Sequence, residues 1–192
     1  MMYTLHYAPD NASLIIRLVL DGSGLPYQTA LVDRAKRQQD SAAYRALNPT
    51  GLIPTLETPN GPISETGAIL LWLSDTHSLG PAPSDPDRQV FLKWLFFLSN
   101  TAHAELRQIF YPRQYVPADA HRAHLEIMSS RMLRHFGLVE TAALQHPRLF
   151  AAGRPLGVYT TVLTRWARLY PEGGPRWLDM TAFPTLEALA RA

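Results

Sequence analysis

The sequence predicts an α/β domain in the first part of the chain and an all-α helical bundle in the rest. Short β-type runs alternate with helical patterns up to residue 78, an order typical of α/β domains. Beyond residue 86 the apolar residues recur at helical spacing. Between these parts, three prolines and a glycine form a stiff stretch that cannot continue a helix. We therefore expect domains at 1–78 and 87–192, joined by a linker at 79–86.

The first domain is expected to begin with a strand at Tyr3 to Tyr7, a helix from Ser13 and a second strand over 27–32. Strand–helix–strand units join parallel strands by a right-handed crossover, so this helix should start where ligands usually bind. A weak helix over 41–47, a hairpin around residue 60 and a helix over 65–76 follow. The resulting order, β-α-β-α-β-β-α, is that of a thioredoxin-like domain.

Four helices are expected in the second domain. One begins at Asp85 or Asp87 and runs towards Phe110, and another has Pro117 in its first turn. A third starts near residue 158, and Pro184 opens a short last one.

Composition excludes several kinds of partner and site. The 192 residues carry a net charge of only +2, which gives no reason to expect nucleic acid or an anionic membrane as a partner. The absence of cysteine excludes disulfides and a protein thiol nucleophile. His121 and His124 share a helix without a carboxylate at ligand spacing, so no metal site is expected. With no signal peptide or apolar run of the ~18 residues that a membrane span needs, we expect a soluble, cytoplasmic protein.

The stretch from Asn48 to Trp72 carries most of the chemical information. Pro54 directly precedes a strand-like segment, where it cannot donate to a sheet. A cis bond before it would turn the Ile53 backbone outward, so that an extended peptide could dock on it as an extra strand. Alternatively, Pro54 merely starts a strand.

Ser64, Glu65 and Thr66 stand just before an apolar helical run. A helix N-terminus attracts a carboxylate, and a glutamate beside it would hold an amine. Alternatively, these three residues merely cap the helix. Taken with Ile53, they suit a small extended peptide that has an amino-acid zwitterion at one end.

The pattern Asn-Pro-x-Gly-x-Ile-Pro followed by Glu-Thr-x-Ala-Ile resembles the glutathione site of the glutathione S-transferase family, and the resemblance extends across essentially the whole chain. It implies that Ile53 pairs with the cysteinyl backbone of glutathione and that Pro54 is a cis proline. It also implies that Glu65 and Thr66 hold the γ-glutamyl group, and that the protein is a homodimer.

The segment before the first helix is closest to the bacterial beta-class pattern Tyr-x-Pro-x-x-Cys-Ser-Leu, but Ala12 replaces its cysteine. A transferase must lower the pKa of the bound thiol, because the thiolate is the nucleophile. Ser13 is the first candidate donor to the sulfur, although its hydroxyl could instead cap its own helix. Asn11 could donate through its amide, and Tyr7 is an outside candidate.

Two segments of the helical domain bear on the resemblance. His103 matches a beta-class histidine near glutathione, whereas Thr101 and Ala104 replace the glutamate and lysine beside it. Where the family has a Ser/Thr-x-x-Asp capping box, this chain has Gly157 and Thr160. We therefore expect Gly157 to be the N-cap of this helix, and the helix start to be about 1 kcal/mol less stable than in family members.

Two functions follow from these residues. The first is a detoxification-type transferase that activates the glutathione thiol for attack on a small hydrophobic electrophile, with glutathione as co-substrate. The alternative is a catalytically weak or inactive protein of the same fold that acts as an interaction or binding module. Ala12, Thr101 and the missing capping aspartate favour the alternative, whereas Ile53, Pro54, Glu65 and Thr66 favour the transferase.

Overall fold

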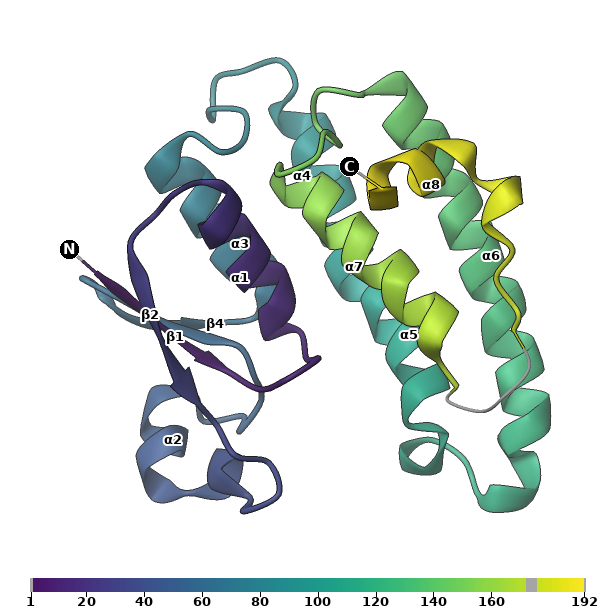
Figure 1. The fold of residues 1–192 in the computed structure, drawn as a ribbon, viewed down its shortest axis with the longest axis horizontal. Helices are drawn as coiled ribbons and strands as arrows, with labels where there is room; N and C mark the ends of the chain where they lie inside the picture. Colours follow the sequence, from purple (N-terminus) through teal and green to yellow (C-terminus); the bar gives the residue numbers. More distant parts are fainter. Residues whose placement is uncertain (1, 172–175, 192) are drawn as a thin grey trace. The chain divides into compact units, whose positions relative to one another are not determined.

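The computed structural model describes residues 2–171 and 176–191, and the chain divides into two compact units, Met1–Arg88 and Gln89–Ala192. In Figure 1 the first unit runs from purple to blue and the second from teal to yellow. Residues 78–87 form neither helix nor strand. The exact domain and linker boundaries given above stay predictions.

A four-stranded mixed sheet forms the centre of the first unit. Its strands are β1 (Tyr3–Tyr7), β2 (Tyr27–Leu31), β3 (Thr55–Thr58) and β4 (Gly61–Ser64). They lie in the order β2-β1-β3-β4, with β1 parallel to β2 and antiparallel to β3. The β3–β4 hairpin completes the sheet.

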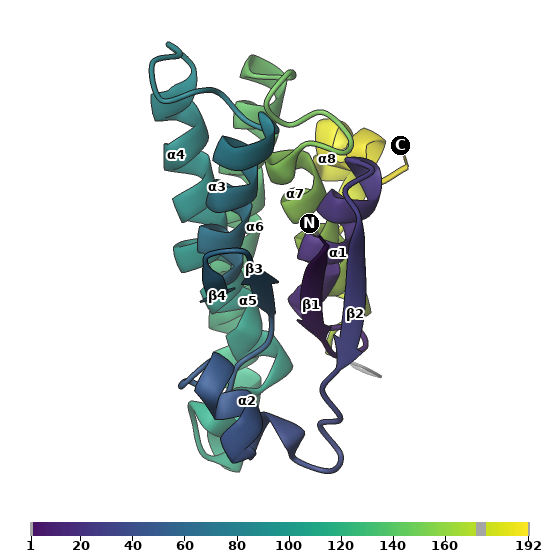
Figure 2. The same cartoon turned by 90° about the vertical axis from the view of Figure 1, so that its left-hand side faces the viewer.

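Three α-helices accompany the sheet. Helices α1 (Ser13–Gly22) and α3 (Thr66–His77) lie side by side against it, whereas α2 (Ala42–Leu47) lies beyond the strand ends (Figures 1 and 2). Helix α1 buries Ile15, Ile16, Val19 and Leu20, because these apolar residues recur along one side of a 3.6-residue repeat. The predicted thioredoxin-like fold is thereby confirmed.

Within its described residues, all the regular secondary structure of the second unit is helical, as predicted. Its helices are α4 (Arg88–Phe96), α5 (His103–Phe110), α6 (His121–Gln145), α7 (Pro155–Leu169) and α8 (Pro184–Arg191). A π-helical segment, Phe97–Ala102, joins α4 to α5 without a break, so the predicted long helix up to Phe110 is present. Within the described ranges, no helix is long and apolar enough to cross a membrane.

A buried carboxylate joins two of these helices. Glu105 of α5 accepts hydrogen bonds from Arg131 of α6 and lies 2.8 Å from Nε2 of His135 in the same helix. The hydrogen bonds from Arg131 outweigh burial and lower the pKa of Glu105. The carboxylate therefore stays ionised and holds α5 against α6.

The start of α7 differs from the prediction. The helix begins at Pro155, with Arg154 as an extended N-cap, so Gly157 lies within its first turn. Proline suits this first position because its fixed φ is already helical. A Cβ atom on Gly157 would lie 2.2 Å from the carbonyl oxygen of Ala151 and 2.5 Å from that of Phe150. Gly157 thus allows the preceding loop to pass directly against the helix, and the prediction that it is the N-cap is wrong.

His103 is packed among aromatic rings at the start of α5. Its Nδ1 lies 2.9 Å from the hydroxyl of Tyr159, and its ring centroid lies 5.4 Å from that of Trp166. Burial, with a smaller contribution from the charge of Arg107, lowers the pKa of His103 to about 4. The imidazole is therefore neutral at pH 7.

We expect Gly157→Ala to lower the free energy of unfolding by at least about 2 kcal/mol, because the added methyl group meets backbone oxygens rather than flexible side chains. Urea unfolding measures the change. Gly137→Ala in α6 is the matched control, since no atom lies within 4 Å of its added Cβ. The control should gain up to about 1 kcal/mol. Equal effects of the two substitutions would contradict the close approach at Gly157.

The depressed pKa of His103 predicts a loss of stability in acid. The unfolded chain binds this proton near the ordinary pKa of 6.5, whereas the folded chain binds it only near 4. The contribution is therefore fully present above pH 6.5 and is lost as the pH falls to 4, by up to about 3 kcal/mol. Urea unfolding of the wild type and His103→Gln between pH 7 and 4 should show their stability difference shrinking. Parallel curves would contradict a neutral His103.

Candidate active site

The loop before Ile53 is fixed by hydrogen bonds to a single carbonyl. The oxygen of Leu52 accepts from the hydroxyl of Tyr44 at 2.7 Å and from the amide nitrogen of Asn48 at 2.8 Å. The hydroxyl of Thr50 in turn donates to the side-chain oxygen of Asn48 at 2.8 Å. Gly51 has a φ of +67°, and a Cβ there would lie only 3.0 Å from a backbone oxygen, so glycine is required. The Asn-Pro-Thr-Gly segment therefore sets the position of Ile53.

Ile53 has its side chain inside and its backbone unpaired. The side chain lies in a buried cluster with Ala8, Val32 and Tyr44. The Ile53–Pro54 bond is cis, which confirms the prediction. Among the hydrogen bonds formed by the described residues, none uses the backbone N–H or C=O of Ile53. These two groups are free to pair with an extended peptide.

Glu65 stands in an unusual backbone conformation at the start of α3. It has φ +69° and ψ 118°, in the region that favours glycine, and its carbonyl accepts from the N–H of Ile69 at 2.9 Å. Neither its exposed carboxylate nor the hydroxyl of Thr66 has a partner in the described parts of the chain. No side chain caps the helix here. The alternative in which residues 64–66 serve as caps is therefore wrong.

The hydroxyl of Ser13, the first residue of α1, is used in hydrogen bonds to the loop that follows β1. Ser13 is 1% exposed, and its hydroxyl donates to the carbonyl of Ala8 at 3.2 Å and accepts from the N–H of Ala8 at 3.3 Å. The Ser13 hydroxyl does not cap α1, so the alternative prediction that it would do so is wrong. The hydroxyl instead closes the loop back onto the end of β1.

Asn11 lies in the same loop with its amide held in one orientation. Its side-chain oxygen accepts from the N–H of Ser13 at 3.3 Å. Its side-chain nitrogen has no partner among residues 2–171 and 176–191. Asn11 thus presents a side-chain N–H donor in the loop just before α1.

The remaining predicted site residue, His103, belongs to the helical unit and hydrogen-bonds Tyr159 there. Sequence reasoning missed the roles of Tyr44 and Asn48. The turn residues in Asn-Pro-x-Gly were the signal for Asn48, whereas nothing local marks Tyr44. Within the described ranges, no three histidine, aspartate or glutamate side chains are placed to hold a metal ion.

Comparison with known proteins agrees with this geometry. Residues 12–76 match the family described as "Glutathione S-transferase, N-terminal domain". The chain is 29% identical over 170 residues to glutathione S-transferase GST-4.5 of Xanthomonas campestris pv. campestris, which covers 85% of this chain and 81% of that protein.

Two solved structures are similar along almost the whole chain. One is a glutathione transferase homologue from Sulfitobacter with bound glutathione, with a TM-score of 0.80, 22% identity, and coverage of 99% of this chain and 91% of that one. The other is the beta-class glutathione S-transferase of Sphingomonas chungbukensis, with a TM-score of 0.76, 23% identity, and coverage of 98% and 90%. The chain thus resembles the N-terminal domain of glutathione S-transferases over residues 12–76, and each of its two units has the fold found in these glutathione transferase structures.

Proposed function

We propose that this protein is a glutathione transferase, which activates the thiol of glutathione for attack on a small hydrophobic electrophile. The observation that carries the proposal is the set of unpaired polar groups in the first unit. It comprises the backbone of Ile53, the carboxylate of Glu65 and the hydroxyl of Thr66. The glutathione-bound Sulfitobacter homologue supports glutathione as the peptide.

Each group has one role in holding glutathione. The Ile53 N–H and C=O pair with the cysteinyl backbone as an added strand would. The Glu65 carboxylate accepts from the ammonium of the γ-glutamyl group. The Thr66 hydroxyl and the first N–H groups of α3 hold its carboxylate, which the helix dipole also favours.

Asn11 is the better donor to the glutathione sulfur. Its amide nitrogen is unpartnered, whereas the Ser13 hydroxyl is committed to Ala8 in both directions. An N–H donated to the sulfur favours the thiolate over the thiol. The thiol first gives its proton to solvent, and the thiolate then forms a C–S bond with the electrophilic carbon. The bond broken at that carbon is the one to a leaving group, which departs with the electron pair, or a π or strained-ring bond, whose electron pair moves to the neighbouring atom and is protonated from solvent.

Three further expectations stay predictions here. They are a contact of His103 with glutathione, a homodimer, and a cytoplasmic location with a role in detoxification. The neutral state of His103 at pH 7 means that such a contact would be a hydrogen bond rather than an ion pair.

The alternative is a binding module of the same fold. It draws support from Ala12, which has no donor, and from the occupied hydroxyl of Ser13. A protein that binds glutathione without lowering its thiol pKa would fit this alternative.

We expect wild-type protein to be retained on immobilised glutathione, and Glu65→Ala to bind at least about tenfold more weakly, because an ammonium loses its only carboxylate. Glu187→Ala, which removes a partly exposed carboxylate that pairs with Arg191 on α8, is the control and should be retained as wild type is. Loss of retention in the control, or full retention in Glu65→Ala, would contradict this site.

Ultraviolet titration of the bound thiol tests its activation. Asn11→Ala should raise the pKa of the bound thiol by about 1, which corresponds to the loss of one charge-assisted hydrogen bond. Ser13→Ala should leave that pKa nearly unchanged and lower the free energy of unfolding by about 1–3 kcal/mol, because it leaves backbone groups of Ala8 unpaired. The reverse pattern would return the catalytic role to Ser13.

A further inference from the structure

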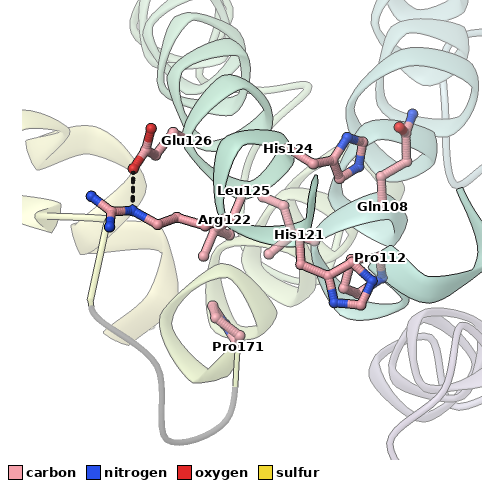
Figure 3. A pocket seen from close by; sticks show the side chains of 9 residues that line it. Gln108, Pro112, His121, Arg122, His124, Leu125, Glu126 and Pro171 are labelled. Carbon is pink, nitrogen blue, oxygen red and sulfur yellow. Dashed lines mark hydrogen bonds and ion pairs between the residues drawn. The ribbon is translucent and has the colours of Figure 1, made fainter. Parts of the chain in front are cut away.

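Two histidines line the cavity of the helical unit, but a ligand in the cavity cannot reach their Nε2 atoms. The cavity has a volume of about 580 Å³ and lies between the end of α5 and the first turns of α6 (Figure 3). The Nε2 atoms of His121 and His124 are buried there, without partners in the described part of the chain. A network of polar side chains on the sheet of the first unit bears more directly on the peptide site.

This sheet has one apolar and one polar face. Leu5 of β1 and Leu56 of β3 lie opposite each other and are fully buried. Side chains alternate between the two faces along a strand, so the residues beside these leucines point the other way. On that second face His6 lies opposite Thr55, and Glu57 follows two residues after Thr55. An imidazole, a hydroxyl and a carboxylate are therefore neighbours on one face of the sheet.

His6 connects Glu57 to Tyr44. Its Nε2 atom lies 2.8 Å from Oε1 of Glu57, and the imidazole is the donor because a carboxylate only accepts. The ring of His6 packs edge-on against that of Tyr44, with 5.8 Å between centroids and 62° between planes. Within residues 2–171 and 176–191, this imidazole is the only aromatic ring in contact with Tyr44. The hydrogen bond to Glu57 therefore fixes the ring that supports Tyr44.

The hydroxyl of Tyr44 meets two partners at once. It donates to the carbonyl of Leu52 at 2.7 Å and lies 3.0 Å from Oγ1 of Thr55. A phenol has a single hydrogen to donate, so the bond to Leu52 persists only while the ring of Tyr44 points at that carbonyl. The orientation of the ring is thus coupled to the position of the Leu52 carbonyl, one residue before Ile53.

We propose that His6 is a positioning residue for glutathione, held in place by Glu57 and acting through Tyr44. A correctly oriented Tyr44 ring holds the carbonyl of Leu52, and with it the backbone of Ile53 that pairs with the peptide. This role rests on the function proposed above. His6 is not one of the groups that hold glutathione or donate to its sulfur, so it should change the affinity for glutathione and leave the pKa of the bound thiol unchanged.

A double-mutant cycle on the full chain tests this role, with calorimetric titration of reduced glutathione as the measurement. His6→Ala should weaken binding about fivefold and Tyr44→Phe about tenfold, because the first loosens and the second removes the hydrogen bond to the Leu52 carbonyl. The double variant should bind no more weakly than Tyr44→Phe alone, since without the hydroxyl the orientation of the ring no longer matters. Ultraviolet titration should give the same pKa for the bound thiol in all four proteins.

Conservative and control variants separate this role from a general loss of stability. Glu57→Gln keeps an oxygen that accepts from the imidazole and should bind glutathione as wild type does, whereas Glu57→Ala should bind about threefold more weakly. Thr4→Ala is the matched control. Thr4 is two residues from His6 on the same face of β1, and its hydroxyl accepts from the amide of Gln28 at 3.0 Å. This variant should bind as wild type does.

An additive loss of about fiftyfold in the double variant, or a thiol pKa that His6→Ala shifts, would overturn the role of His6. Wild-type affinity in both His6→Ala and Glu57→Ala would overturn this role alone, whereas wild-type protein that does not bind glutathione would overturn the proposed function as well. If His6→Ala fails to fold by circular dichroism, Glu57→Ala and Glu57→Gln decide, because the side chain of Glu57 is 44% exposed.

Discussion

The first unit depends on the carbonyl of Leu52, which accepts two hydrogen bonds at once. One donor, Tyr44, comes from α2, and the other, Asn48, is the residue that ends this helix. Burial raises the pKa of Tyr44, so its hydroxyl stays protonated and keeps donating at neutral pH. A helix of only six residues therefore decides where the Ile53 backbone lies. Ser41 caps that helix through the N–H of Tyr44, which links a single hydroxyl to the geometry of the peptide site.

The helical unit is organised by different means. The Glu105 carboxylate holds α5 against α6 through Arg131 and His135. At α7, the backbone of the preceding loop packs directly on the backbone of the helix at Gly157. Both solutions place rigid contacts between neighbouring segments, where a substitution affects more than its own side chain.

The sequence was a good guide wherever a local pattern has one physical cause. The alternation of strands and helices predicted the thioredoxin-like sheet, and the Ile53–Pro54 motif predicted the cis bond. Prediction from the sequence failed where a side chain bonds to a residue outside its own helix or strand. Ser13 looks like a helix cap in sequence, but Ala8 takes its hydroxyl because the loop folds back on β1. In the same way, no local pattern predicts that the Tyr44 hydroxyl reaches the carbonyl of Leu52.

Glu65 carries a cost that no other residue of the peptide site shares. Its left-handed backbone is strained by roughly 1–3 kcal/mol in a residue with a side chain, and glycine would relieve that strain while deleting the carboxylate. Backbone stability and the binding role proposed for Glu65 therefore make opposite demands on this one position. A variant chain with no need of the proposed ligand would be free to relieve the strain by placing glycine there.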